Sequence, residues 1–534
     1  MFTQTEGLYV AHCEEGPLSI CGRMANRHGL IAGATGTGKT VSLQVIAETF
    51  CQAGVPCFMA DMKGDLSGIS QTGAMSGFIQ KRCAEFGIDN PQFAGCPTRF
   101  FDVYGEQGHP MRTTISNMGP QLLSRLMQLN DVQEGVLNVL FRVADERGLL
   151  LIDLKDLRSM LAYVAENAAD ISRQYGAVSA TSVAAIQRAL LELENQGADS
   201  FFGEPSFDIF DLMQCEGGKG VMSVLAADRL MLNPKLYSTF LLWLLSDIYA
   251  QLPEVGDLDL PKLVFFFDEA HTLFEDTSKA LVAKIEQVIR LIRSKGVGIY
   301  FVTQNPTDIP ENILGQLGNR VQHALRAYTP KDQKAVRAAA ETFRANPAFS
   351  TEDAIMQLET GEALVSFLDE KGAPAMVQRA RILFPLSQIG AVTESQRSQL
   401  INASRLYGRY DHPIDRESAF EVLLAESEKA AEEQQQIQES AETEKTSGTG
   451  RKSSRSDKGG KAADNGLAKK IATAAVGAAI ASVSRSVGTS VSNKITGKKS
   501  KTTSAKSVAG RAASSAASSV VRNLTRSILG NLLK

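Results

Sequence analysis

The 534-residue sequence has few of the features that mark secreted or membrane-spanning proteins. Its seven cysteines are scattered, form no Cys-x-x-Cys pair and do not stand at metal-binding spacing from the six histidines. We therefore expect neither a disulfide framework nor a zinc site, and a reducing compartment fits this pattern. No basic stretch followed by an apolar one begins the chain, and no apolar run reaches the roughly 18 residues that a bilayer requires. We expect no signal peptide, no transmembrane helix and a cytoplasmic location.

The chain also lacks a uniform excess of basic charge, since its net charge is −3. Residues 446–534 hold 17 Lys and Arg against 2 Asp and Glu, a net of +15, which leaves residues 1–445 with a net of −18. This balance excludes a uniformly basic nucleic-acid-binding protein but permits a local basic channel. The hydrophobic content of 43% is ordinary for a globular protein and is enough for a sizeable core.

The apolar pattern predicts an α/β fold. The first 27 residues are mixed in character, and continuous apolar segments that predict buried strands then alternate with helical patterns such as that of residues 235–252. The expected strands are residues 29–32, 55–61, 98–105, 220–228, 263–267, 296–304, 320–328 and 361–369. Strands of this kind, separated by helices, are typical of a parallel sheet covered on both faces. We expect the last strand to pair with residues 374–383.

Composition changes within and after this pattern. Residues 120–215 are rich in Leu, Ala, Glu and Arg at helical spacing, which predicts a helical insertion into the sheet domain. Residues 421–445 contain 8 Glu and 2 Lys and predict a solvated helix, whereas residues 446–466 have the composition of a disordered linker. Beyond it, residues 521–532 have apolar positions at helical spacing, which fit either an interfacial or partner-binding helix or a mostly disordered tail.

A glycine-rich segment follows the first long apolar strand and precedes a predicted helix. It fits G-x-x-x-x-G-K-[ST], in which glycines let successive backbone N–H groups point at phosphate oxygens. The helix that follows presents its positive N-terminal end to the same phosphates. Lys39 is expected to reach the β- and γ-phosphates, and the Thr40 hydroxyl to bind Mg²⁺. The segment predicts nucleotide binding by Gly33, Ala34, Thr35, Gly36, Thr37, Gly38, Lys39 and Thr40.

Two carboxylates end the very apolar strand at residues 263–267. Asp268 could hold Mg²⁺ directly or through water, and Glu269 could orient or deprotonate the attacking water. Many strands end in Asp-Glu, so the pair is informative mainly because a phosphate loop precedes it. The adjacent glutamate favours a hydrolase over a kinase, because it supplies a group that activates water.

Three further sites have two interpretations each. Gln304 ends the next strand, at the edge that faces the ligand crevice in parallel nucleotide-binding sheets, and is either a γ-phosphate sensor or an ordinary polar residue. Arg290 and Arg293 lie one turn apart before Gly296; one could reach a neighbouring subunit, although the helix dipole alone explains cations there. The segment Asp61–Asp65 could touch nucleotide, metal or polymer, or form a simple turn.

Together these motifs resemble the HerA/FtsK class of RecA-like P-loop ATPases. The segments that carry the resemblance are GATGTGKT, DMKGD, FFFDEAH, RLIRSKGVG and FVTQNP, in this order. Within the class, LGNRVQHALRAYTPKDQKAV is most similar to the bacterial YjgR-type HerA-like ATPases. The resemblance covers about residues 9–410. HerA proteins carry an N-terminal β-barrel, whereas 32 residues precede Gly33 here, so we expect this barrel to be missing.

The resemblance implies a RecA-like fold, homo-hexameric rings, and ATP and Mg²⁺ as cofactors. It implies catalytic roles for Lys39, for Glu269 on the attacking water and for Gln304 as γ-phosphate sensor. Thr40 and Asp268 would bind Mg²⁺. Arg293 matches the arginine that is offered to the neighbouring subunit, with Arg320 as a second candidate.

These expectations divide the chain into five parts. Residues 1–119 and 216–410 form the two parts of the ATPase domain, with the phosphate loop in the first and the acidic strand end and sensor in the second. Residues 120–215 form the helical insertion, residues 411–445 an acidic helical segment, and residues 446–534 a basic low-complexity tail, disordered or helical.

Two functions fit this organisation. The first is Mg²⁺-dependent ATP hydrolysis by a HerA-like ring, coupled to translocation or remodelling of DNA; the DNA part rests on family analogy. The alternative is an ATP-gated scaffold or signalling module whose basic tail recruits it to an anionic surface or a protein partner. A small-molecule or nucleotide kinase is disfavoured, because we find no second substrate-binding signature.

Overall fold

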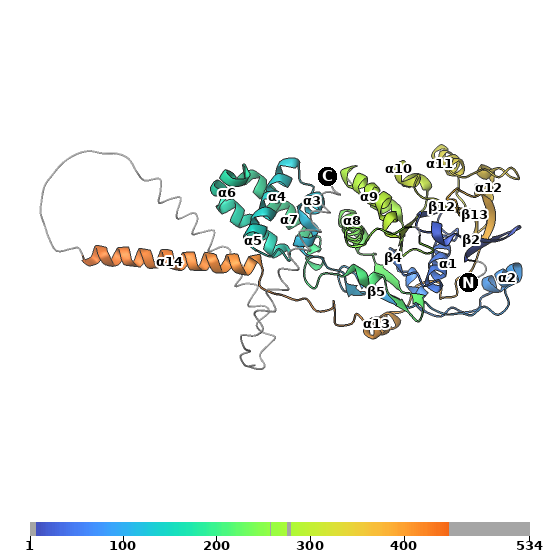
Figure 1. Ribbon diagram of the computed structural model, residues 1–534, viewed down its shortest axis with the longest axis horizontal. Helices are drawn as coiled ribbons and strands as arrows, with labels where there is room; N and C mark the ends of the chain where they lie inside the picture. Colours follow the sequence, from blue (N-terminus) through green and yellow to red (C-terminus); the bar gives the residue numbers. More distant parts are fainter. Residues whose placement is uncertain (1–6, 257, 275–278, 448–534) are drawn as a thin grey trace.

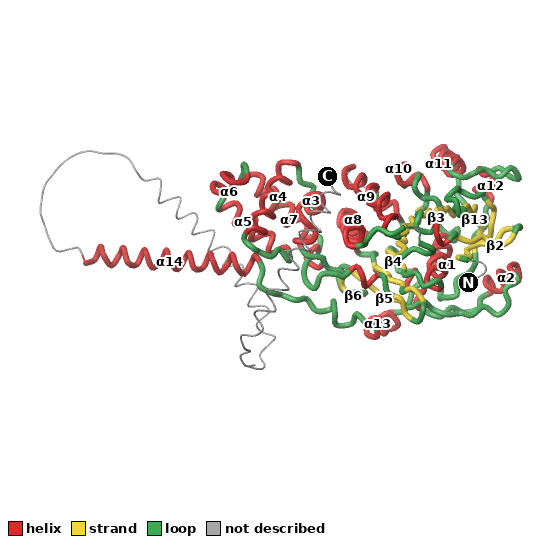
Figure 2. Tube along the Cα trace, in the orientation of Figure 1, coloured by secondary structure: helices red, strands yellow, loops and turns green. Residues whose placement is uncertain are grey.

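The computed structural model of the chain describes residues 7–256, 258–274 and 279–447. A sheet with helices on both faces lies beside a group of helices, and one long helix projects beyond that group (Figure 1). Figure 2 shows the strands gathered in one half of the molecule. None of the helices in these residues has the length and apolar character needed to cross a membrane.

Twelve strands build the main sheet, in the spatial order β2-β1-β14-β13-β12-β3-β11-β10-β4-β9-β5-β6. Neighbouring strands from β12 to β6 are parallel, and those from β12 to β2 are antiparallel. The predicted α/β fold with a mostly parallel central sheet is confirmed. The strands are β1 (Leu8–Cys13), β2 (Gly16–Ile20), β3 (Gly29–Ala32), β4 (Cys57–Asp61), β5 (Thr98–Asp102), β6 (His109–Pro110), β9 (Met222–Ala226), β10 (Leu263–Phe267), β11 (Val297–Thr303), β12 (Asn319–Gln322), β13 (Glu362–Ser366) and β14 (Gln378–Ile382).

Helices connect these strands and extend beyond them, and a small hairpin, β7 (Cys215–Glu216) with β8 (Lys219–Gly220), precedes β9. The helices are α1 (Lys39–Gln52), α2 (Gly77–Phe86), α3 (Ile115–Leu126), α4 (Asp131–Glu146), α5 (Leu154–Glu166), α6 (Ala168–Tyr175), α7 (Ala180–Asn195), α8 (Pro234–Gln251), α9 (Lys279–Ile292), α10 (Glu311–Leu314), α11 (Pro330–Glu341), α12 (Thr351–Gln357), α13 (Glu394–Ala403) and α14 (Ala419–Ser447).

Strand β10 illustrates why the sheet needs uninterrupted apolar strands. All of its side chains are buried. Phe265 and Phe267 pack in the core shared with α8 and α9, whereas Val264 and Phe266 pack in the core shared with α1. Because successive side chains of a strand point to opposite faces, a sheet covered on both faces requires apolar residues at every position.

Helices α3–α7 share the first of these cores rather than forming one of their own. Leu137, Leu157 and Leu190, from three of these helices, belong to the same buried cluster as Phe265 of the sheet. The helical region begins at Ile115, ahead of residue 120 where the sequence predicts it. Gly119, at φ +74°, breaks the helix one turn into α3, so the helical pattern is clear only after that point.

Two parts of the sheet differ from the sequence prediction. Strands β1 and β2 form an antiparallel hairpin within the first 27 residues. In β2 every residue except Ile20 is half-buried or exposed, so no long apolar run marks this strand. The strand expected over residues 320–328 ends at Gln322. After His323 the chain leaves the sheet, because Ala324 and Leu325 pack in a separate small core beneath α11 and α12. The predicted pairing of residues 361–369 with residues 374–383 is confirmed by β13 and β14.

The segment between β14 and α14 returns across the sheet to the helical region. Helix α13 lies on β5, where the Arg397 guanidinium stacks 4.5 Å from the centre of the Phe100 ring. Further along, Asp411 Oδ1 is hydrogen-bonded to Nδ1 of the buried His109 at 2.8 Å. This segment therefore fastens the helical region to the sheet.

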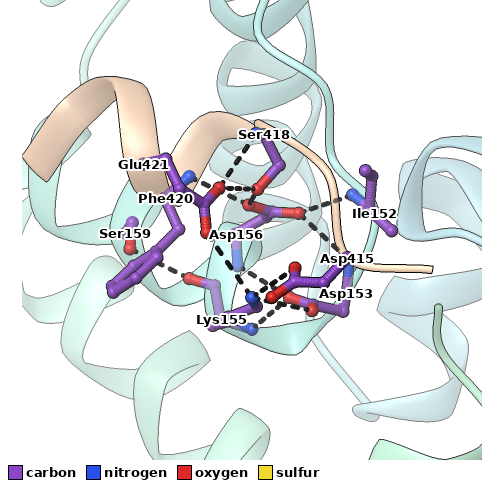
Figure 3. Close-up of polar contacts among 9 residues, drawn as sticks. All are labelled: Ile152, Asp153, Lys155, Asp156, Ser159, Asp415, Ser418, Phe420 and Glu421. Atoms are coloured by element: carbon purple, nitrogen blue, oxygen red, sulfur yellow. Dashed lines mark hydrogen bonds and ion pairs between the residues drawn. The ribbon is translucent and has the colours of Figure 1, made fainter. Parts of the chain in front are cut away.

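Asp156 on α5 holds the start of α14 (Figure 3). Its buried carboxylate accepts hydrogen bonds from Ile152 N (2.7 Å), Asp153 N (3.1 Å) and Phe420 N (2.9 Å), and from the Ser418 hydroxyl (2.5 Å). These donors come from the N-terminus of α5 and from the start of α14, so one carboxylate joins the two helices.

Beyond this junction α14 projects from the molecule (Figure 1). Its described side chains from residue 425 to residue 440 are exposed. The helix occupies most of the region for which the sequence predicts a solvated acidic helix. The expectations for the linker, the basic tail and its final helix concern residues 448–534, which lie outside the described residues.

We predict that Asp156→Ala lowers the free energy of unfolding by about 2–4 kcal/mol, because buried N–H and O–H donors lose their acceptor. Denaturant titration followed by circular dichroism measures this loss. Glu428→Ala, an exposed change on α14, is the control and should stay within about 0.5 kcal/mol of the wild type. Equal stability of the two variants would contradict the role of Asp156.

Candidate nucleotide-binding site

Four neighbouring parallel strands end at one edge of the sheet. In spatial order they are β3, β11, β10 and β4, and their registers place the carboxyl ends side by side. The glycine-rich loop follows β3, Gln304 follows β11, Asp268 and Glu269 follow β10, and Asp61 ends β4. Residues that are far apart in the sequence therefore meet at the edge where parallel sheets bind their ligands.

The glycine-rich loop has a backbone that suits an anion. Gly36 and Gly38 have φ of +78° and +109°, which side-chain-bearing residues rarely adopt. Gly38 caps α1, so the unpaired N–H groups of the first helical turn face the loop. The Thr37 hydroxyl donates to Ala34 O at 2.7 Å and holds the loop closed on itself. This arrangement fits the phosphate-binding role predicted for residues 33–40.

His323 is a buried residue that links the start of α1, next to the loop, to β13. Its Nδ1 lies 2.9 Å from Glu362 O, which can only accept, so Nδ1 carries the proton and Nε2 accepts from the Ser42 hydroxyl at 2.7 Å. Burial lowers the pKa of His323 to about 4, which keeps the ring neutral. The imidazole thus joins β13 to α1. Gly361, the residue before β13, also donates from its N–H to Thr37 O at 3.0 Å.

Lys39 is the first residue of α1, and only 9% of its surface is exposed. Its Nζ donates to Ala34 O at 3.2 Å, within the loop. Burial lowers the pKa of the Lys39 ammonium, while the negative charges of Glu269 and Asp268 oppose this effect. The ammonium therefore lies between the loop and the acidic strand end, where a bound phosphate would meet it.

Asp268 and Thr40 are the residues predicted to hold Mg²⁺. Burial, reinforced by the charge of Glu269, raises the pKa of the Asp268 carboxyl to about 6. A buried carboxylate in a negative surrounding gains from a bound cation, and a carboxylate with a hydroxyl is the hard oxygen set that Mg²⁺ prefers. The described residues contain no cluster of three or more His, Cys, Asp or Glu that could hold a metal. The donor set fits the ion.

Glu269 is held on both carboxylate oxygens. Lys63 Nζ donates to Oε1, Gln304 Nε2 donates to Oε2 at 3.3 Å, and His271 Nδ1 lies 3.4 Å from Oε2. Burial acts to raise the pKa of Glu269, but the Lys63 ammonium and the Gln304 amide outweigh it and bring the pKa below its usual value. The backbone of Glu269 has φ +46°, an uncommon conformation for a residue with a side chain.

The turn after β4 places Lys63 at this site. Asp61 accepts hydrogen bonds from Gly64 N (2.8 Å) and Leu66 N (3.2 Å), and Gly64 has φ +77°. Burial and the neighbouring carboxylates of Asp65 and Asp268 raise the pKa of Asp61 to about 7. The segment Asp61–Asp65 thus forms a turn, which is one of the two interpretations of its sequence. The turn places Lys63 in contact with Glu269.

The two arginine candidates lie elsewhere. Arg293 is exposed and precedes β11, at the opposite end of this seven-residue strand from Gln304. Arg320 lies at the amino end of the sheet too, and its guanidinium donates to three backbone carbonyls, those of Leu317, Thr342 and Leu314. The structure therefore brings together the loop, Asp268, Glu269 and Gln304, and separates both arginines from them within one chain.

Sequence reasoning missed two residues of this edge. Lys63 was one member of a segment with several interpretations, and its contact with Glu269 joins residues 206 positions apart. His323 was assigned to a strand, and its contact with Ser42 spans 281 positions. The DMKGD motif was the only sequence signal for Lys63, and no sequence signal marked His323.

Residues 8–498 match the family described as helicase HerA-like C-terminal. Two curated relatives are each named DNA double-strand break repair helicase HerA. The protein of Sulfolobus acidocaldarius is 32% identical over 99 residues, and that of Sulfurisphaera tokodaii is 33% identical over 109 residues. The matches cover 18% and 20% of this chain and 19% and 21% of the relatives, so the chain aligns with about a fifth of each relative's length.

Several solved structures are similar to the chain. The bacterial conjugative coupling protein TrwB has a TM-score of 0.47 and 15% identity, over 72% of this chain and 91% of that chain. TrwB in complex with ADP and Mg²⁺ has a TM-score of 0.46 and 16% identity, over 71% of this chain and 89% of that chain. VirB4 of Thermoanaerobacter pseudethanolicus has a TM-score of 0.44 and 14% identity, over 71% of this chain and 97% of that chain.

We predict that Gly33→Ala weakens ATP binding about ten-fold or more. An added Cβ would lie 2.5 Å from His323 Cβ, so the loop or the imidazole must shift. Overpacking of this kind costs about 1–3 kcal/mol, and about 1.4 kcal/mol is ten-fold in Kd. Titration with a fluorescent ATP analogue measures the change.

Gly87→Ala is the matched control for this variant. Gly87 ends α2 at φ +64° with open space around it, so the substitution strains the backbone without touching the loop. It should leave the Kd for ATP unchanged. The same Kd for both variants would show that the contact with His323 does not shape the loop.

Proposed function

The chain belongs to the helicase HerA-like C-terminal family, and from this premise we propose that it is a Mg²⁺-dependent ATPase that works as a homo-hexameric ring on DNA. The observation that carries the proposal is the convergence of four strand ends at one edge of the sheet. That edge holds a phosphate loop, a buried lysine, two carboxylates and an amide. Each group has a place in phosphoryl transfer to water.

The proposed reaction proceeds in the order in which these groups would meet ATP. The loop and the first turn of α1 receive the phosphates, and the Lys39 ammonium stabilises their negative charge. Thr40 and Asp268 would hold Mg²⁺, and the ion would supply charge neutralisation for the phosphates. Glu269 accepts a proton from water while the water oxygen bonds to the γ-phosphorus. The bond from that phosphorus to the bridging oxygen breaks, and ADP and phosphate leave.

Gln304 acts beside Glu269 in this proposal. Its amide already reaches the Glu269 carboxylate, so it lies where the attacking water and the γ-phosphate would meet. An amide can both donate and accept, which suits a group that orients water and responds to the loss of the γ-phosphate.

Ring assembly supplies the remaining cation. Arg293 precedes β11 and Gln304 follows it, and a strand of that length spans roughly 20 Å at about 3.3 Å per residue. Arg293 therefore cannot reach the phosphate loop of its own chain. An exposed arginine on the far edge of the sheet is suited to reach the nucleotide of a neighbouring subunit in a head-to-tail ring.

DNA is the proposed polymer because both curated relatives are named DNA repair helicases. The net charge of −18 over residues 1–445 confines phosphate contacts to local surfaces such as a ring channel. In the alternative, an ATP-gated scaffold recruited through the basic tail, the same site would turn over ATP without regard to DNA. The response of turnover to DNA separates the two functions.

We predict that Glu269→Gln abolishes ATP hydrolysis but preserves ATP binding. The amide keeps the size of the side chain but cannot accept a proton from water, and loss of a positioned base costs about 10²–10⁴-fold in rate. Single-turnover hydrolysis and equilibrium binding of labelled ATP measure the two properties. Lys39→Ala, the comparison, should lose both, and hydrolysis retained by either variant would contradict the assigned site.

We predict that Arg293→Ala is inactive alone and is complemented by Lys39→Ala in mixed rings. A mixed interface can pair an intact phosphate loop from one subunit with an intact arginine from the next. Random mixing of equal amounts should restore roughly one quarter of wild-type turnover for head-to-tail interfaces. Arg290→Ala, which removes a cation paired with Glu286 one turn away, is the control and should remain active by itself. Mixtures without any regained turnover would contradict action in trans.

A further inference from the structure

Residues 320–347 form a basic stretch in an otherwise acidic part of the chain. They contain 6 Lys and Arg against 2 Asp and Glu, a net of +4, whereas residues 1–445 as a whole have a net of −18. Most of these cations lie on α11 and on the loop that precedes it. The proposed hydrolysis of ATP uses none of them. A local basic surface on an acidic protein suits an anionic partner.

Helix α11 presents its cations to solvent. Two alanines and Val336 form its buried face, whereas Lys331 and Lys334, one turn apart, are exposed. Arg326, in the loop before the helix, is exposed too. Among the residues that the structure describes, none forms an ion pair with these three side chains. A phosphate could therefore contact them without first breaking an existing pair.

Tyr328 lies between these cations in the sequence. Its side chain is 80% exposed, and it belongs to none of the apolar clusters of the described residues. Its backbone is nevertheless held, because Tyr328 N and Thr329 N donate to the Asp332 carboxylate at 3.1 and 2.9 Å. Packing does not account for this ring. An exposed aromatic ring flanked by cations is the arrangement on which unpaired bases of a nucleic acid stack.

This surface adjoins the nucleotide site through two contacts. Ala324 O, just before the loop, accepts from Ala34 N of the phosphate loop at 2.8 Å. Helix α11 also packs against the turn Pro306–Asp308, which follows Gln304. A strand bound on α11 would therefore lie on elements that contact both the phosphate loop and the turn after the proposed sensor.

We propose that Tyr328, Arg326, Lys331 and Lys334 bind an unpaired strand of DNA. One base stacks on the Tyr328 ring, and the cations contact the neighbouring phosphates. The inference rests on the proposed function on DNA and narrows it, because a base can stack on the ring only when it is free of its complementary strand. Duplex DNA offers such a base only where its strands are opened.

Photocrosslinking of the full chain to a single DNA strand that carries iododeoxyuridine tests this site. Mass spectrometry of the crosslinked peptides identifies the residue that contacts the base. We expect the crosslink on Tyr328, and Tyr328→Phe, which keeps the ring and loses the hydroxyl, should crosslink at the same position. Crosslinks found only elsewhere in the chain would overturn the inference.

The two lysines are tested by the dependence of this crosslink on strand concentration, which reports the affinity of this site alone. The double variant Lys331→Gln, Lys334→Gln should need about ten-fold more strand for half-saturation at physiological salt, since two phosphate contacts are lost. The control is Arg188→Gln, Arg405→Gln, which removes the same charge from exposed positions elsewhere and should behave as the wild type does. Equal shifts in both double variants, or no shift in the first, would show that α11 has only a solvated face.

Three further probes decide the ligand. A duplex of the same sequence should crosslink to Tyr328 several-fold less, because its bases stack on one another. An equal yield from the duplex would contradict the stacking of an unpaired base. A higher yield from an RNA strand that carries iodouridine would assign the site to RNA instead. Labelling of Tyr328 by an azido-ATP photoprobe would assign the ring to the nucleotide and overturn the inference.

Lys39→Ala separates the strand site from the proposed ATPase. This variant should lose ATP hydrolysis but crosslink to the strand as the wild type does, because Lys39 lies in the phosphate loop and not on α11. Hydrolysis by the wild type without a crosslink at Tyr328 would refute the strand site alone. A crosslink at Tyr328 without any hydrolysis by the wild type would refute the ATPase and leave the strand site standing.

Discussion

The structure depends on the parallel alignment of β3, β11, β10 and β4. The carboxyl ends of parallel strands lie at the same edge of the sheet, so the polar residues that follow these strands lie there together. The strands can run together only because both faces of the sheet are covered by apolar cores, one shared with α1 and one with α8 and α9. The burial that stabilises the fold therefore also concentrates the phosphate loop, the carboxylates and the amide of the proposed active site.

The same edge links the nucleotide site to the rest of the molecule. His323 and Gly361 join the phosphate loop to β13, in the antiparallel part of the sheet. The chain that follows β14 then crosses the sheet to α5, where Asp156 holds the start of α14. Hydrogen bonds and the connecting chain thus link the phosphate loop, the antiparallel strands and the helical region.

Much of this could be predicted from the sequence, for identifiable reasons. The strands β3 and β10 and the loop between β3 and α1 are local patterns, readable from apolar runs and glycine spacing. The hairpin of β1 and β2 was missed because β2, a partly exposed edge strand, has no apolar run, and the buried β1 is short and ends in His12 and Cys13. The contacts of Lys63 with Glu269 and of His323 with Ser42 depend on the order of strands in space, which local patterns do not contain.

The most direct test of the account is steady-state ATP turnover by the full chain with Mg²⁺, with and without double-stranded DNA, at physiological salt. The account predicts turnover that requires Mg²⁺ and rises on addition of DNA. Turnover that ignores DNA would keep the nucleotide site but contradict the DNA-coupled function. The absence of any Mg²⁺-dependent turnover would contradict the central claim that this edge of the sheet hydrolyses ATP.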